Sequence, residues 1–247
     1  MDSPRLEVLV THPRDVAGAQ EGGADRLLVT SLPAGAALAD APAAALAPEP
    51  ALLRDVVREA DVPVHALLRL DDSWTTTGAG LVRLAGLGHD LLGQGAAALS
   101  FGFLDADLEV DAALCAALLE HLPGAAWTFP EAVDAALDPR RSWRRLLDLP
   151  GLVGVRSAGS ARGVDAGLDE LLALAADPRV AALLVPGPGL RAEHVPWLVG
   201  ASVGWFHLGP QARPGGSAKA YVDAALVRSW RTLLDAAAQR RAGAAER

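Results

Sequence analysis

Short, almost uniformly apolar runs alternate along this chain with longer stretches in which apolar residues recur at helical spacing. The first run is Leu6–Val10, and a helical stretch begins after it near Pro13, where proline suits a first helical turn. Runs without polar alternation are typical of parallel strands that are covered on both faces. The predicted strands are Leu6–Val10, Asp25–Thr30, Val64–Leu68, Ala96–Phe103, Ala125–Phe129, Leu152–Arg156, Ala181–Val185 and Val203–His207.

The stretches between these runs predict the helices of a repeating strand–helix unit. After the helix near Pro13, helices are predicted at Ala51–Ala60, Gly80–Gly93, Ala112–His121, Ser142–Leu149, Ala166–Ala176, Ala192–Leu198 and Tyr221–Ala238. Ser31–Pro48 is rich in alanine and proline and lacks periodicity, so we expect a long loop there. The residues from about 239 onward are expected to form a frayed helix end.

Eight such units predict a single (β/α)8 barrel, and the length of 247 residues agrees with the roughly 250 typical of that fold. An open doubly wound sheet also alternates strands and helices. A dinucleotide-binding fold of that kind needs a glycine-rich fingerprint after the first strand, where this chain has Thr11-His12-Pro13-Arg14. We therefore expect one barrel domain over residues 1–247, without a linker.

Charge and cysteine content narrow the classes of partner. The formal charge of −8 argues against nucleic acid and anionic membranes, which attract a basic surface. No apolar stretch is long enough for a membrane span, and no signal peptide is recognisable, so we expect a cytoplasmic protein. Cys115 is the only cysteine, which excludes an internal disulfide and a cysteine-rich metal cage.

Several short motifs, taken in order, carry a resemblance to a known family. They include Ala24-Asp25-Arg26, Val64-His65, Gly102–Asp107, Thr128-Phe129, Gly187–Glu193 and Phe206-His207. In this order and spacing the chain resembles the CutC family, which is named for copper homeostasis. The resemblance implies a β/α barrel and a homo-oligomer, and it suggests copper as a ligand through the family name alone.

The chain departs from the family pattern at polar positions. Leu9 and Val10 stand where the family has cysteines, and Leu28 and Thr30 replace a glutamate and a cysteine of the second strand. Two basic positions of the family correspond to Asp71 and to the pair Pro130-Glu131. We therefore expect a degenerate site, which either takes a different small anionic ligand or is vestigial.

The carboxyl ends of barrel strands and the loops after them build the functional site of such folds. The residues expected there are Glu7, Thr30, Arg69, Asp105, Thr128, Arg156 and His207. A buried Glu7 needs a positive partner, for which Arg69 or Arg156 are the candidates. Glu7 and His207 are candidate catalytic groups, although a structural ion pair and a core histidine explain them equally well. Asp105 is a candidate ligand-binding residue that is expected either to bind a metal ion or to cap the following turn.

The segment Gly187-Pro188-Gly189 before a helix resembles an anion-binding turn, with Gly187 and Gly189 as candidate ligand-binding positions. A tight turn is the alternative, because proline removes one backbone donor. For metals, Cu(I) prefers thiolates, and Cys115 is predicted in the middle of an outer helix. The histidines show no metal-binding spacing, so no metal ligand is predicted.

Three functions remain open on the sequence. The first is a CutC-like barrel that binds a small anionic ligand through Arg69, Asp105, Thr128 and Arg156. The second is a small-molecule lyase or isomerase in which Glu7 and His207 exchange protons and Arg69 holds an anion. The third is a catalytically silent interaction protein, for which Trp74, Trp143, Trp197 or Trp230 are candidate contact residues.

Overall fold

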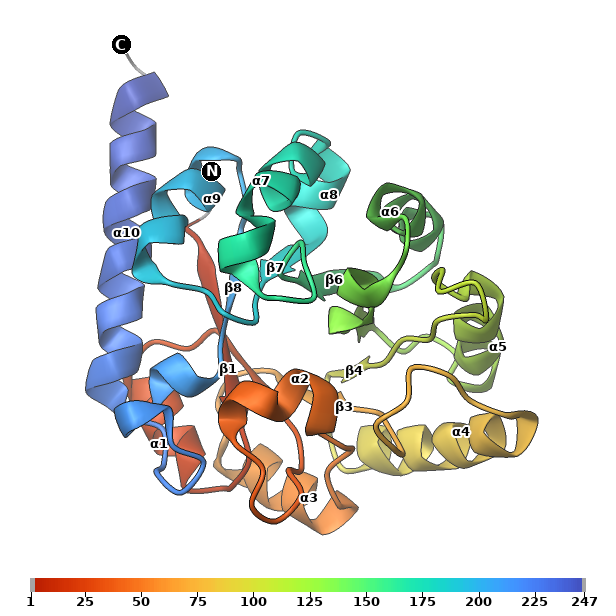
Figure 1. Ribbon diagram of the computed structural model, residues 1–247. Helices are drawn as coiled ribbons and strands as arrows, with labels where there is room; N and C mark the ends of the chain where they lie inside the picture. The colour runs from red at the N-terminus through yellow and green to blue at the C-terminus, as the bar shows by residue number, and fades with distance from the viewer. Residues whose placement is uncertain (1–2, 246–247) are drawn as a thin grey trace.

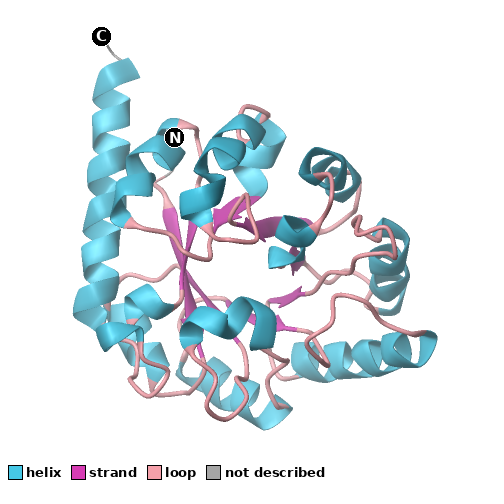
Figure 2. Ribbon diagram, viewed as in Figure 1, coloured by secondary structure: helices cyan, strands magenta, loops and turns pink. Residues whose placement is uncertain are grey.

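A ring of parallel strands forms the centre of the molecule, and helices surround it in the computed structural model, which describes residues 3–245 (Figure 2). The sheet order β7-β6-β5-β4-β3-β2-β1-β8 follows the chain around the ring, and every described pair is parallel. The strands of the described chain are β1 (Arg5–Val10), β2 (Arg26–Val29), β3 (Val64–Leu67), β4 (Ala98–Ser100), β5 (Trp127–Phe129), β6 (Leu152–Ser157), β7 (Leu184–Pro186) and β8 (Trp205–Leu208). The predicted (β/α)8 barrel is confirmed.

The helices lie outside this ring, and the last of them runs along one side of the barrel and extends past it (Figure 1). The α-helices within residues 3–245 are α1 (Asp15–Glu21), α2 (Ala41–Ala44), α3 (Pro50–Glu59), α4 (Gly78–Gly93), α5 (Ala112–His121), α6 (Pro139–Leu147), α7 (Val164–Leu174), α8 (Pro178–Leu183), α9 (Val195–Gly200) and α10 (Ala224–Ala245). The α10 helix continues through the segment where a frayed end is predicted, and residues 246–247 of that segment lie outside the described chain.

The predicted strand Ala96–Phe103 is longer than β4, which comprises only Ala98–Ser100, and two further segments differ in kind from the prediction. Ser31–Pro48 is not a plain loop, because it contains the 3-10 helix η1 (Leu38–Asp40) and the short α2. The predicted strand Ala181–Val185 is wrong in its first half, since Ala181–Leu183 end α8 and only Leu184 begins β7. In both places the apolar pattern is too short to separate a helical turn from an extended run.

Alternation along the strands divides the apolar residues between two cores. On β1, Leu6, Val8 and Val10 belong to the large core between the sheet and its helices. Successive side chains of a strand point to opposite faces, so Glu7 and Leu9 point into the barrel. Leu9 there joins a small apolar cluster separate from the large core. The barrel interior therefore combines an apolar part with a charged part.

Two aspartates, one fully buried and one partly buried, hold the loops at the carboxyl ends of several strands. Asp15 is fully buried and forms an ion pair with Arg213, at 2.8 Å, which ties the segment after β8 to the start of α1. Asp134 accepts hydrogen bonds from the Ser157 hydroxyl at 2.6 Å and from the Ala158 backbone N–H at 2.7 Å. These contacts fix the loops around the carboxyl ends of β1, β6 and β8.

Within residues 3–245, none of the helices combines the length and the apolar character that crossing a membrane requires.

Candidate functional site

A layer of charged side chains crosses the barrel interior, contributed by neighbouring strands in register. Glu7 on β1 is the register partner of Arg26 on β2 and of His207 on β8. The Glu7 carboxylate lies 2.7 Å from Arg26 Nε, 2.8 Å from His207 Nδ1 and 3.4 Å from Arg156 Nη1. These four residues are each no more than 8% exposed. The layer brings Glu7, Arg156 and His207 together, as the sequence predicts for one end of the barrel.

The positive partners of Glu7 keep it ionised. Burial is the largest single influence and raises the pKa of Glu7, but Arg26, the hydrogen bond with His207 and the charge of Arg156 together bring that pKa well below its ordinary value. A carboxylate accepts hydrogen bonds only, so His207 Nδ1 must carry the proton that it donates to Glu7. The other ring nitrogen, Nε2, is then left with a free lone pair in neutral His207.

Glu131 adds a second carboxylate to this layer from the segment after β5. Its two oxygens accept from Arg156 Nε at 2.5 Å and from Arg156 Nη2 at 3.2 Å. Arg156 therefore bridges Glu7 and Glu131, and these carboxylates raise its pKa against the lowering effect of burial, which is the largest influence. The two acids balance the charges of Arg26 and Arg156.

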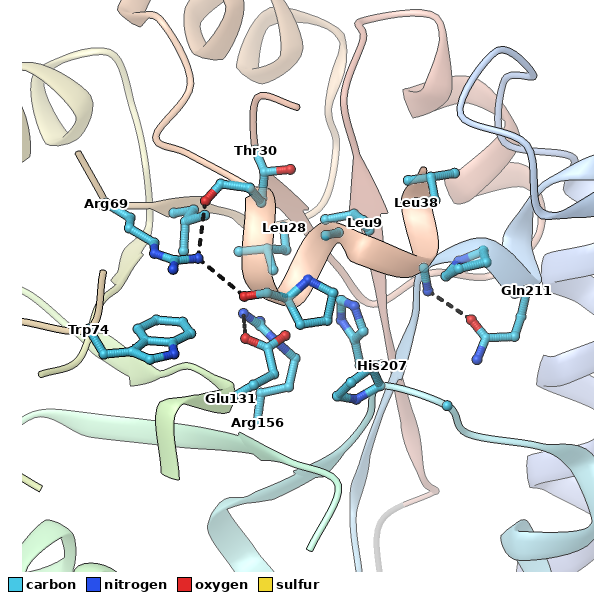
Figure 3. Close-up of a pocket in the computed structure, with 18 residues that line it drawn as sticks. Leu9, Leu28, Thr30, Leu38, Arg69, Trp74, Glu131, Arg156, His207 and Gln211 are labelled. Atoms are coloured by element: carbon cyan, nitrogen blue, oxygen red, sulfur yellow. Dashed lines mark hydrogen bonds and ion pairs between the residues drawn. The ribbon is translucent and has the colours of Figure 1, made fainter. Parts of the chain in front are cut away.

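A cavity of about 40 Å³ lies above this layer, at the carboxyl ends of the strands. Figure 3 shows Arg69 and Trp74 on one side of it and His207 and Gln211 on the other. A single water needs roughly 10–15 Å³ by this measure, so the cavity accepts only a few water-sized groups. Its polar wall consists of Thr30, Arg69, Glu131, Arg156, His207 and Gln211.

Residues 38–45, which we call the lid, cover this cavity. They comprise η1, α2 and Ala45, and they place Leu38, Ala41 and Ala45 against Leu9, Leu28 and Leu67 of the strands. Leu38 is only 1% exposed. The mouth of the barrel is therefore largely filled by apolar side chains, which restricts both the size of a ligand and its access.

Arg69 holds the lid and does not contact Glu7, which corrects the expectation that it is a candidate partner of that carboxylate. Its Nη1 donates to the carbonyls of Pro42 at 3.1 Å and Ala45 at 3.4 Å, and its Nη2 donates to the Asp72 carbonyl at 2.5 Å. The guanidinium carbon lies 3.9 Å from the centre of the Trp74 ring, in a cation–π contact. Arg69 has no ion pair within the described residues, and its Nε has no hydrogen-bond partner there.

The remaining predicted positions divide between the barrel and its surroundings. Thr128 is buried in the barrel but does not line the cavity, and its hydroxyl has no partner in the described chain. Asp105 lies away from the cavity, where it accepts from the Asp107 and Glu109 backbone N–H groups and so caps its own turn. Gly189 lines the cavity, whereas Gly187 lies against His207. A Cβ atom added at Gly187 would lie only 3.2 Å from the Cβ of His207.

Two parts of the site are not predicted from the sequence. Arg26 stands within a family motif, and only an alignment of the starts of the predicted strands Leu6–Val10 and Asp25–Thr30 would have placed it beside Glu7. The lid is the second part, because its helical turns are too short for a periodic signal. The tryptophans predicted as partner contacts differ in exposure. Trp143 is 1% exposed and belongs to the core, whereas Trp197 is 64% exposed and lies on the surface.

Potential metal ligands in the described residues do not fit a Cu(I) ion. Cys115 is fully buried on α5, and burial raises the pKa of its thiol to about 12, so that it stays protonated at neutral pH. A cluster of Asp165, Glu193 and His194 lies elsewhere, but Arg191 pairs with both of its carboxylates. Since Cu(I) prefers thiolate and thioether ligands, neither place offers it a suitable set.

An eight-stranded parallel barrel with a charged layer beneath a cavity at the strand ends defines a TIM-barrel protein. The sequence profile of the CutC family matches residues 5–211. The chain therefore belongs to the CutC family.

Individual relatives agree with this assignment. A CutC family protein of Klebsiella pneumoniae is 30% identical over 109 residues, which cover 43% of this chain and 42% of that protein. The chain thus aligns with less than half the length of that curated relative. The CutC structure of Streptococcus agalactiae, described as a copper homeostasis protein, superposes with a TM-score of 0.70 at 16% identity, covering 83% of this chain and 97% of that one.

Other barrels share only the fold. The homocysteine methyltransferase MmuM of Escherichia coli has a TM-score of 0.61 and 15% identity, over 94% of this chain and 96% of that one. Fold likeness at this identity carries no information about substrate or reaction.

Proposed function

We propose that this CutC-family barrel binds a small organic anion in the cavity between Arg69 and His207. The observation that carries this proposal is that Arg69, only 6% exposed, makes no ion pair within the described residues, so that the carboxylates acting on its charge, Glu131 first and then Asp72 and Asp71, lie beyond ion-pair distance. A buried cation without a direct ion pair is costly, and an anionic ligand in contact with it offsets part of that cost. The carboxylates of the layer below are already occupied by Arg26 and Arg156.

The dimensions of the cavity support a ligand whose charged end is a single carboxylate. Its volume of about 40 Å³ suits a carboxylate group, and a larger ligand body requires the lid to move. Arg69 Nε is the donor without a partner, and His207 lines the opposite side. Binding would then exchange some of the carbonyl contacts of Arg69 for contacts with the ligand.

Isothermal titration with acetate, glycolate and pyruvate tests this proposal. We expect at least one of these acids to bind the wild-type protein and its affinity to fall at least tenfold in Arg69→Met. Arg83→Met, on the exposed surface of α4, is the matched control and should bind as the wild type does. Equal affinities in wild type and Arg69→Met, or no binding of any acid, would refute an anion site at Arg69.

A second candidate function is proton transfer by His207, as in a lyase or isomerase. The observation that favours it is the 2.8 Å contact between Glu7 and His207 Nδ1, which leaves Nε2 as a base beside the cavity. In such a reaction Arg69 holds the carboxylate of the ligand, and His207 takes a proton from a carbon next to the ligand's ketone group and returns it. NMR of pyruvate in D₂O measures this as deuterium uptake at the methyl group, which should vanish in His207→Gln.

The family is named for copper homeostasis, but this proposal does not include a Cu(I) site with thiolate ligands. The one cysteine of the chain, Cys115, is a buried neutral thiol. A cytoplasmic location and a homo-oligomeric assembly belong to the proposal. The exposed Trp197 on α9, beside α10, supports an interface between copies. Cell fractionation and light scattering test these two points.

A further inference from the structure

The amino-terminal end of the barrel carries a second pocket, opposite the cavity just described. It is open, has a volume of about 580 Å³ and lies where the strands begin. Arg26, His65 and Trp205 form its polar and aromatic wall. The alanines Ala97, Ala98 and Ala126 also line it, so that the pocket stays wide where barrels commonly place large branched side chains.

Two buried nitrogen atoms of this wall lack partners. Arg26 is 4% exposed, and its Nη2 has no hydrogen-bond partner in the described chain, while its Nε is held by Glu7. His65 is 5% exposed, and its Nδ1 is likewise unpartnered within residues 3–245. Most buried polar groups in proteins are hydrogen-bonded, and an exception calls for a ligand or an ordered water.

The charges around this pocket favour an anion over a cation. The guanidinium carbons of Arg5 and Arg26 lie 4.6 and 3.8 Å from the centre of the Trp205 ring. Glu7 balances the charge of Arg26, whereas Arg5 makes no ion pair within residues 3–245, so this wall keeps one excess positive charge. The one carboxylate that lines the pocket, Asp25, is paired with Arg231 at 3.1 Å and accepts from the Leu6 backbone N–H. Its negative charge is thereby offset.

We propose that this amino-terminal pocket binds a small organic carboxylate, with Arg26 Nη2 and His65 as hydrogen-bond donors and with Trp205 and the alanines around its apolar body. One guanidinium shared with Glu7 suits a singly charged anion better than inorganic phosphate. Catalysis in such barrels belongs to the opposite end, so the pocket is assigned binding and no reaction. It is linked to the other site because Arg26 also holds Glu7, the partner of His207.

The test uses benzoate as the probe and backbone amide NMR as the readout. We expect benzoate to shift the amides of Ala98 and Ala126 and the indole N–H of Trp205, in a saturable manner. Ala126→Leu narrows the pocket and His65→Leu removes a donor, and each should weaken benzoate binding at least tenfold. Arg69→Met disables only the other site and should leave these shifts unchanged.

These three variants distinguish benzoate binding in this pocket from binding in the cavity at the other end of the barrel. Loss of the shifts in Arg69→Met, shifts confined to Gly189 and Gly209, or shifts retained in both Ala126→Leu and His65→Leu would each overturn the proposal. Inorganic phosphate that binds as tightly as benzoate would overturn the assignment to organic carboxylates. The separate titration with acetate, glycolate and pyruvate tests the proposed anion site at Arg69, so the two proposals can fail independently.

Discussion

Glu7 and Arg26 occupy paired positions on β1 and β2, and their side chains meet at 2.7 Å inside the barrel. His207 occupies the position paired with Glu7 on the other side, on β8. Because parallel strands in register place such residues on one level, the charged layer is a property of the barrel framework. Glu7 lies at its centre, with a positive group on one side and an imidazole on the other.

Glu7→Gln should therefore destabilise the protein strongly. Removing one partner from a buried ionic network costs about 3–5 kcal/mol, because the remaining charges stay buried without compensation. Urea denaturation measures this as a lower free energy of unfolding. Glu120→Gln, on the exposed face of α5, should change that free energy by less than about 0.5 kcal/mol. In the double variant Glu7→Gln with Arg26→Met, part of the loss should return, since both charges are gone.

Arg69→Met should loosen the lid while the barrel stays folded. The variant loses three donated bonds, two of which reach the carbonyls of Pro42 and Ala45. A hydrogen bond from a charged donor is worth about 1.5–3 kcal/mol, so the exchange of the Ala45 amide hydrogen should speed up at least tenfold. Hydrogen exchange followed by mass spectrometry measures this. Unchanged protection of the lid would show that apolar packing alone holds it.

His65 should make stability fall as the solution becomes acidic. Burial first, and the charge of Arg26 second, lower the pKa of His65 from 6.5 to about 4. Between these two values the unfolded chain binds a proton that the folded protein does not, so stability is full above pH 6.5 and is lost as the pH falls toward 4. The shift corresponds to about 3 kcal/mol. His65→Asn should remove this component from the pH profile of urea unfolding, and the exposed His89→Asn should not.

Asp134 should titrate near neutral pH and act in the opposite direction. Burial is the largest cause and raises the pKa of Asp134 to about 7, against the hydrogen bonds from Ala158 and Ser157. The folded protein then keeps a proton that the unfolded chain has released, so this contribution to stability is full below pH 3.8 and is lost as the pH rises through about 7. The ¹³C shift of the Asp134 carboxyl should show a midpoint near pH 7. A midpoint near 4 would mean that the hydrogen bonds donated to the Asp134 carboxylate outweigh the effect of burial on its pKa.

The barrel was predictable from the sequence because its signal is repeated and local. A strand such as Leu6–Val10 is uninterrupted by polar alternation except at Glu7, and the following helix begins with a suitable turn. The beginning of β7 was not predictable to the residue. The apolar residues of Ala181–Val185 are compatible with the end of a helix and with the start of a strand, and tertiary packing decides where α8 ends and β7 begins.

The site was predictable only in part. Glu7, Arg156 and His207 come together as expected, but Glu7 lies in the layer below the cavity and not at the barrel mouth. The direction of Arg69 depended on the lid, whose position follows from packing of Leu38 against strand residues far away in the sequence. Long-range packing of this kind leaves no periodic trace in a single sequence.

The lid is a part of the barrel mouth that one connection of the chain supplies by itself. Residues 38–45 lie in the connection between β2 and α3, and their apolar contacts and the carbonyls that Arg69 binds decide how much of the barrel mouth is filled. Insertions, deletions or small-to-large changes in this one connection can therefore alter which molecules enter, without disturbing the charged layer of Glu7, Arg26 and Arg156. The covering of the barrel mouth and the charged layer inside the barrel are therefore set by different stretches of the same chain.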